Sequence, residues 1–143
     1  MRTDFIEVID NFLTQSYYES LRELITSNTF PWYYNENITY DKETINECLI
    51  NGSHLTQSFG FSHVVLSDSE TTSNASNLII PFALQVKDYL KASSILRIRL
   101  DMTVYNPDVV MHGPHVDYKD KMHYSSVYYL NDSDGPTVIF NEK

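Results

Sequence analysis

The chain has 143 residues, of which 42% are hydrophobic, and its formal net charge is −9. This length suits one domain with one core, and an acidic balance offers no general phosphate-binding surface, which argues against nucleic acid as a partner. The single cysteine, Cys48, excludes an internal disulfide and leaves no cysteine-based zinc site visible. The first thirty residues contain acidic side chains and no long apolar run, so we expect no signal peptide, no membrane span and a cytoplasmic location.

The first third of the chain is predicted to contain one strand and one helix. Residues 5–9 (FIEVI) are typical of a short strand. Ser16 and Glu19 have the spacing of a capping box, which predicts the start of a helix. The apolar face of this helix is predicted from residues at helical spacing: Tyr17, Leu21, Leu24 and Ile25.

The middle of the chain alternates between irregular segments and regular elements. Residues 30–58 are predicted to be mostly irregular, with a short extended piece at 30–34. Residues 60–66 (GFSHVVL) indicate a strand, and residues 67–77 a polar loop. A second helix is predicted from about residue 80 to 91, with Pro81 near its start, where a missing N–H does no harm.

The last third has the period of two that is typical of strands. Residues 95–105 alternate without a break, and we expect residues 122–130 and 136–141 to form a hairpin around the turn at 131–135. A loop is predicted at 106–114. Helices followed by an antiparallel meander predict an α+β or mainly β class.

The polar face of the strand predicted at 95–105 has two interpretations. It contains Arg97, Arg99, Asp101, Thr103 and Tyr105. In a sandwich such a face lies in water, whereas in a small open-mouthed barrel it lines a cavity. The two arginines could bind a carboxylate in that cavity, or each could pair with Asp or Glu across the sheet.

His115 and Asp117 are the candidate metal ligands. Side chains two residues apart on an extended segment point to the same side, so an imidazole nitrogen and a carboxylate oxygen can reach one metal ion. Another histidine would complete the two-histidine, one-carboxylate set of non-haem Fe(II) oxygenases. Because a histidine and an aspartate at this spacing also arise by chance, the competing interpretation is a polar surface loop after residues 113–114.

Residues 97–140 resemble the first half of the double-stranded β-helix, or jelly roll, of prolyl 4-hydroxylase-like Fe(II)/2-oxoglutarate oxygenases. The resemblance rests on His115-Val116-Asp117, on the segment Val127-Tyr128-Tyr129-Leu130-Asn131, and on the Asp134-Gly135 turn with its apolar strand. It covers about a third of the chain closely, and residues 5–13 with the following helix resemble the entry to this fold more loosely. Small proteins of this kind occur in bacteria and phages, which implies the cytoplasm of a bacterium or of a phage-infected host.

The resemblance implies roles for four residues. His115 and Asp117 match the first two iron ligands, and Tyr129 matches a residue that binds the distal carboxylate of 2-oxoglutarate. Tyr105 matches a strand tyrosine that faces the co-substrate. The implied activity is hydroxylation of a C–H bond with Fe(II), 2-oxoglutarate and O₂, on a prolyl or other peptide side chain or on a small molecule.

The chain departs from the family pattern after Asp117. The family has a third ligand histidine and a basic residue for 2-oxoglutarate later in the sequence, whereas here His123 alone among histidines follows Asp117, on the neighbouring predicted strand. We therefore expect a single oxygenase-like domain over 1–143, with helical support over about 1–93 and an incomplete jelly roll over about 94–143. Three alternatives remain: a fragment of a longer protein, a second chain that supplies the missing strands, or a catalytically inactive relative that acts as a binding or structural module.

Overall fold

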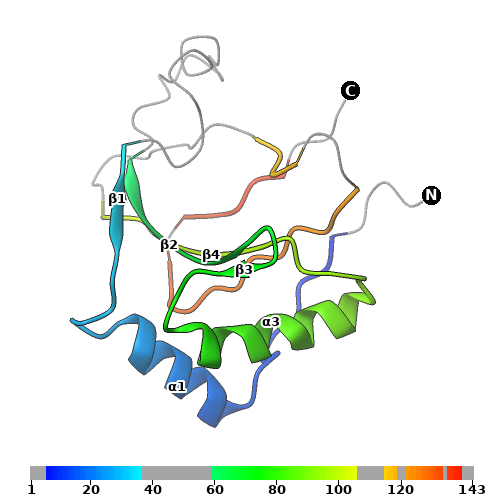
Figure 1. Ribbon diagram of the computed structural model, residues 1–143, viewed down its shortest axis with the longest axis horizontal. Coiled ribbons are helices and arrows are strands. Elements are labelled where there is room, and N and C mark those ends of the chain that lie inside the picture. Colours follow the sequence, from blue (N-terminus) through cyan, green and yellow to red (C-terminus); the bar gives the residue numbers. More distant parts are fainter. Residues whose placement is uncertain (1–5, 37–58, 106–114, 119–121, 134, 140–143) are drawn as a thin grey trace. The chain divides into compact units, whose positions relative to one another are not determined.

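The computed structural model describes residues 6–36, 59–105, 115–118, 122–133 and 135–139. The chain divides into two compact units, Met1–Phe30 and Pro31–Lys143. The described residues form an α+β structure with two helices and a small antiparallel sheet (Figure 1). The predicted α+β class is thus confirmed. The sheet is open, so the jelly roll stays a proposal.

Helix α1, Gln15–Ile25, lies in the first unit and confirms the helix predicted there. Leu21 and Ile25 are one turn apart and both are buried, as the apolar periodicity predicts. Two details differ. The helix begins one residue before Ser16, and its N-cap Thr14 makes no side-chain hydrogen bond, so the predicted capping box is wrong. Residues 6–9, the described part of the strand predicted at 5–9, form no strand.

The sheet in the second unit is built around β2, Gly60–Ser67, which confirms the strand predicted at 60–66. Strand β4, Arg97–Met102, pairs antiparallel along almost all of β2 and is shorter than the predicted 95–105. Strand β1, Tyr33–Asn35, pairs antiparallel with the first residues of β2. The two-residue strand β3, Glu70–Thr71, pairs with its last residues. Because β2 contacts all three other strands, it is the centre of the sheet.

The turn between β2 and β3 was predicted as part of a polar loop and is instead a tight hairpin. Ser67 pairs with Glu70, and the two residues between them, Asp68 and Ser69, have φ angles of 48° and 70°. A two-residue hairpin with positive φ at both positions is the turn whose twist matches that of paired strands. Aspartate tolerates this backbone region without an adjacent glycine, so the usual sequence signal for such a turn is missing.

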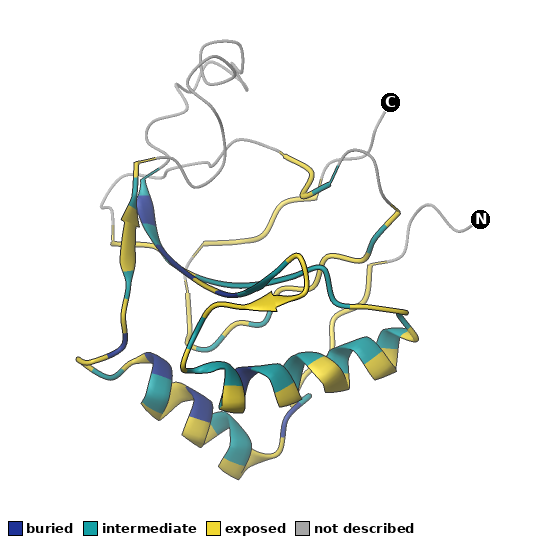
Figure 2. Ribbon diagram, viewed as in Figure 1, coloured by how far each residue is buried: buried dark blue, intermediate teal, exposed yellow. Residues whose placement is uncertain are grey.

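The core of the second unit contains Val65, whose exposed fraction is 0%, and Ile79 on α3 (Figure 2). Val65 lies at a β-bulge, since Val64 pairs with Arg99 and Leu66 pairs with Ile98. The extra residue therefore has no partner in β4, and its carbonyl accepts a hydrogen bond from the amide of Thr72 instead.

Helix α3, Ser76–Leu90, contacts β2 and begins four residues before the predicted start. Pro81 is consequently inside the helix, not near its start. Its missing N–H leaves the carbonyl of Asn77 without a helical partner, and Asn77 is exposed, so water can supply one. The helix ends where Lys91 adopts a left-handed conformation with φ of 53°. Among the described helices, none is long and apolar enough to cross a membrane.

The segments predicted as the last two strands do not form strands where they are described, residues 122–130 and 136–139. In the first segment Tyr128 and Leu130 are half-buried, whereas Val127 and Tyr129 are exposed. Tyr128 packs against Phe82 of α3, with ring centroids 4.8 Å apart. The strand predicted at 122–130 is therefore wrong, because this segment has no ladder partner among the described residues.

Candidate functional site

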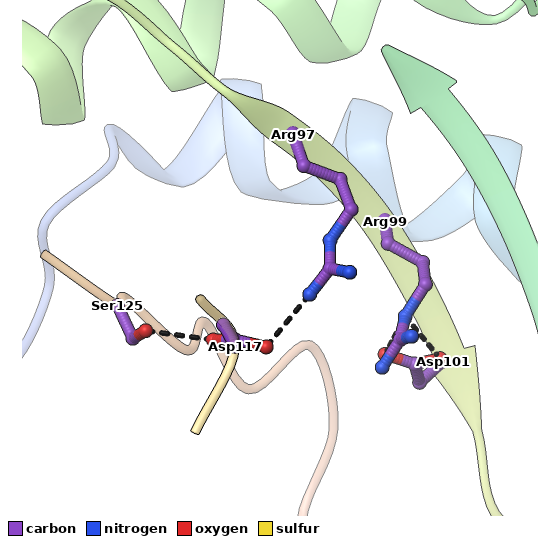
Figure 3. A network of polar contacts seen from close by, with 5 residues as sticks. All are labelled: Arg97, Arg99, Asp101, Asp117 and Ser125. Atoms are coloured by element: carbon purple, nitrogen blue, oxygen red, sulfur yellow. Dashed lines mark hydrogen bonds and ion pairs between the residues drawn. The ribbon is translucent and has the colours of Figure 1, made fainter. Parts of the chain in front are cut away.

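The carboxylate of Asp117 is held from two sides by side chains that are distant in sequence. Its Oδ1 accepts a hydrogen bond from Nη2 of Arg97 on β4, at 2.7 Å. Its Oδ2 accepts one from Oγ of Ser125, also at 2.7 Å (Figure 3). Both contacts have the short length of hydrogen bonds to a charged group. The two contacts fix the plane of the carboxylate between β4 and the segment 122–130.

These contacts keep Asp117 charged. Desolvation by burial raises the pKa of the carboxyl group. The hydrogen bond from Ser125 and the charge of Arg97, with smaller contributions from His115 and Arg99, together lower the pKa by more than burial raises it. The net result is a pKa below the ordinary value of 3.8. A metal-binding carboxylate must be deprotonated, and Asp117 meets this condition at neutral pH.

The two arginines of β4 both pair with carboxylates, but neither pair runs across the sheet as the sequence interpretation expected. Arg99 donates from Nε to the two oxygens of Asp101, at 2.9 Å each, within the same strand. The guanidinium of Arg97 also lies over the ring of Tyr118, 5.7 Å from its centroid. The side chains of Arg97 and Asp117 are each 31% exposed, so their ion pair is only partly screened by solvent.

His115 lies two residues before Asp117 and is exposed. Its effect on the pKa of Asp117 places the two groups within electrostatic reach of each other. In the parts of the chain that are described, no group of three or more His, Cys, Asp or Glu side chains could hold a metal ion. His123 makes an edge-on ring contact with Tyr118, with centroids 5.4 Å apart. Both predicted ligands, His115 and Asp117, are among the described residues, and His112 lies outside them.

The two predicted co-substrate tyrosines are not brought to Asp117 by any hydrogen bond or ring contact among the described residues. Tyr105 follows the end of β4 and is 85% exposed. Tyr129 is 55% exposed, and its hydroxyl hydrogen-bonds Oγ1 of Thr137. Their roles toward 2-oxoglutarate remain predictions.

The donor set fits part of an Fe(II) site. An imidazole and a charged carboxylate are two of the three ligands that such a site uses. Hydrogen bonds that orient a ligand carboxylate are the usual outer layer of metal sites, and Arg97 and Ser125 supply them here. A carboxylate can accept about four hydrogen bonds or metal bonds, so the two contacts leave acceptor capacity for a cation.

Sequence reasoning missed Ser125 and the role of His63. Ser125 could have been suspected from a small polar side chain within a predicted strand that follows the candidate ligands. His63 is only 4% exposed, and it links β2 to the carbonyl of Pro31 through Nδ1 at 2.7 Å and to Oγ of Ser73 through Nε2 at 2.6 Å. No pattern in the sequence marks these partners, which lie in two other segments.

Comparison of the chain with protein families, curated proteins and solved structures gave no match.

Proposed function

We propose that this chain is an Fe(II)- and 2-oxoglutarate-dependent dioxygenase in which His115 and Asp117 are iron ligands. The observation that carries the proposal is the state of Asp117: a charged carboxylate, two residues after an imidazole, oriented by Arg97 and Ser125. In a surface loop, the competing interpretation, these contacts would hold the loop and would serve no metal ion. The proposed reaction is hydroxylation of a C–H bond in a prolyl or other peptide side chain.

The proposed fold is a double-stranded β-helix whose first strand is β4. The ion pair of Arg97 with Asp117 ties the segment after β4 back to that strand, and Ser125 ties the next segment to the same carboxylate. The bond between Tyr129 and Thr137 brings residues 122–130 beside residues 135–139. These contacts bring successive segments of the chain together, and they support the proposal of an incomplete jelly roll.

In the proposed site, Fe(II) with 2-oxoglutarate and O₂ supplies the oxidising chemistry when bound. The chain's own residues orient and charge the site. Asp117 and His115 supply a negative and a neutral donor, and Ser125 keeps the carboxylate from rotating away. Tyr105 and Tyr129 are the proposed contacts to the co-substrate. The third ligand is not among the described residues.

One observation favours a second candidate, a non-catalytic binding or structural module. Both oxygens of Asp117 already have protein partners, and Arg97 neutralises the carboxylate without a metal ion. A relative that had lost iron would retain such a pair because an unpaired carboxylate at a partly buried position is costly. The two candidate functions differ in whether a cation binds Asp117 and displaces part of its contacts with Arg97 and Ser125.

The direct test is anaerobic titration of the 143-residue chain with Fe(II) and 2-oxoglutarate, followed by absorption spectroscopy. The dioxygenase proposal predicts a metal-to-ligand charge-transfer band that is lost in His115→Ala and in Asp117→Ala. His123→Ala is the matched control, since it removes an imidazole outside the proposed ligand pair, and it should retain the band. Absence of the band in the wild-type chain contradicts the enzyme proposal and leaves the binding module.

A further inference from the structure

Two of the chain's four arginines lie two residues apart on β4, and each is paired with a carboxylate near the proposed iron site. Arg97 and Arg99 extend from the same face of the strand, toward Asp117 and Asp101 respectively (Figure 3). Residues at this spacing share a face, so the two guanidinium groups are neighbours. This places the two positive charges side by side in a strongly acidic protein.

The pairs use only part of each guanidinium. An arginine has five N–H donors arranged to hold a carboxylate at two points. Arg97 contacts Asp117 through Nη2, and Arg99 contacts Asp101 through Nε. With side chains 31% and 27% exposed, both arginines remain accessible from solvent. Asp117 and Asp101 therefore occupy positions that a carboxylate of a ligand could take.

We propose that Arg97 and Arg99 form the recognition site for a carboxylate group on the substrate, and that Asp117 opens this site when it takes up the metal ion. The inference rests on the proposed function and adds a substrate class to it: a peptide or small molecule with an acidic group near the C–H bond that reacts.

Charge balance gives the physical reason for this coupling. The two arginines and two aspartates together carry no net charge, so a divalent cation on Asp117 leaves an excess of positive charge. The cation and the guanidinium of Arg97 then compete for the carboxylate of Asp117. The repulsion between these two positive charges weakens the hydrogen bond from Arg97 to Oδ1 of Asp117. A guanidinium that loses its partner at a partly buried position gains by binding another anion.

The rest of the molecule makes these arginines the favoured place for an anion. With a net charge of −9, most of the surface repels acidic ligands. A carboxylate can therefore bind only where local positive charge exceeds this background. The cluster satisfies that condition only when a cation is present, so cation and acidic substrate should bind cooperatively.

The test uses two probes that differ only in charge, N-acetyl-L-aspartate amide and its neutral counterpart N-acetyl-L-asparagine amide. The 15N-labelled chain is titrated with each probe, with and without saturating 2-oxoglutarate, and with and without Zn(II) as a redox-inert replacement for Fe(II). Zn(II) binding is measured first by calorimetry. Probe binding is read from the Nε–H resonances of the arginines.

We expect Zn(II) to tighten binding of the aspartate probe by about tenfold or more, a factor within the usual range for coupled sites. The asparagine probe should bind no better with Zn(II) than without. Arg97→Gln and Arg99→Gln should remove the tightening, whereas Arg22→Gln, on an exposed position of α1, should not. The comparison of the two probes on the wild-type chain needs no variant, so it tests the inference even if a substitution impairs folding.

The unfavourable outcomes are distinguishable. If Zn(II) binds but the affinity for the aspartate probe does not change, the inference is wrong and the proposed function stands. If the tightening persists in Arg97→Gln and Arg99→Gln, the probe binds the cation directly and the inference is wrong. If 2-oxoglutarate abolishes probe binding, the arginines serve the co-substrate and the proposed substrate class is wrong. If Zn(II) does not bind at all, the proposed function fails together with the inference.

Discussion

Replacement of His63 by phenylalanine tests how the second unit is held together. The carbonyl of Pro31 can only accept, so Nδ1 of His63 must carry a hydrogen, and in the neutral imidazole Nε2 then accepts from the hydroxyl of Ser73. A phenylalanine keeps the ring that stacks on Tyr33 at 5.9 Å but makes neither bond. The substitution therefore separates hydrogen bonding from packing at a buried position.

The size of the effect follows from two lost hydrogen bonds at about 1 kcal/mol each. We expect His63→Phe to lower the free energy of unfolding by about 2 kcal/mol. For a chain of 143 residues, the unfolding entropy of about 0.3 kcal/mol/K converts this to a Tm lower by about 7 °C.

Urea unfolding followed by circular dichroism, with a calorimetric Tm, measures both quantities. His115→Phe is the matched control because the same change is made on an exposed residue, where we expect less than about 0.5 kcal/mol. A His63→Phe protein as stable as the wild type would refute the assignment of a buried, doubly bonded imidazole.

Three other predictions concern Asp117, the buried core and the packing of residues 122–130 on α3. Because the folded-state pKa of Asp117 lies below the ordinary value of 3.8, its contribution to stability is fully present above that pH and is lost as the pH falls through the folded value. Without metal, the stability advantage of wild type over Asp117→Asn should therefore shrink in acid, and an advantage that grows in acid would contradict this sign. Val65→Ala, at a fully buried position, should cost about 2 kcal/mol in urea unfolding, whereas Val138→Ala, on an exposed residue, should cost little. A double-mutant cycle of Phe82→Leu and Tyr128→Leu should give a coupling energy of about 0.5–1.5 kcal/mol, and additive effects would show that residues 122–130 do not pack on α3.

The sequence predicted elements whose signal is contained within the element itself. The apolar spacing of Leu21 and Ile25 on α1 and the apolar run of β2 were sufficient to place these elements within a few residues. The predicted start of α3 was later than the observed one because residues 76–77 were assigned to the end of a polar loop. Helix periodicity identifies a face, but the first turn depends on capping contacts that periodicity does not contain.

Features that depend on partners elsewhere in the chain could not be predicted in the same way. The strand predicted at 122–130 did not form, because a strand also needs a neighbouring backbone at the right register, and the described residues supply none. The same limit applies to the site. The spacing of His115 and Asp117 is local and was visible, whereas Ser125 at Asp117 and Ser73 at His63 become evident only in three dimensions.

The most direct test of the central claim is anomalous diffraction from crystals of the chain grown anaerobically with Fe(II) and 2-oxoglutarate. We predict a single strong iron peak in bonding contact with an imidazole nitrogen of His115 and a carboxylate oxygen of Asp117. An iron peak at any other position, with the Arg97–Asp117 and Ser125–Asp117 bonds unchanged, would contradict the assignment of these two residues as iron ligands.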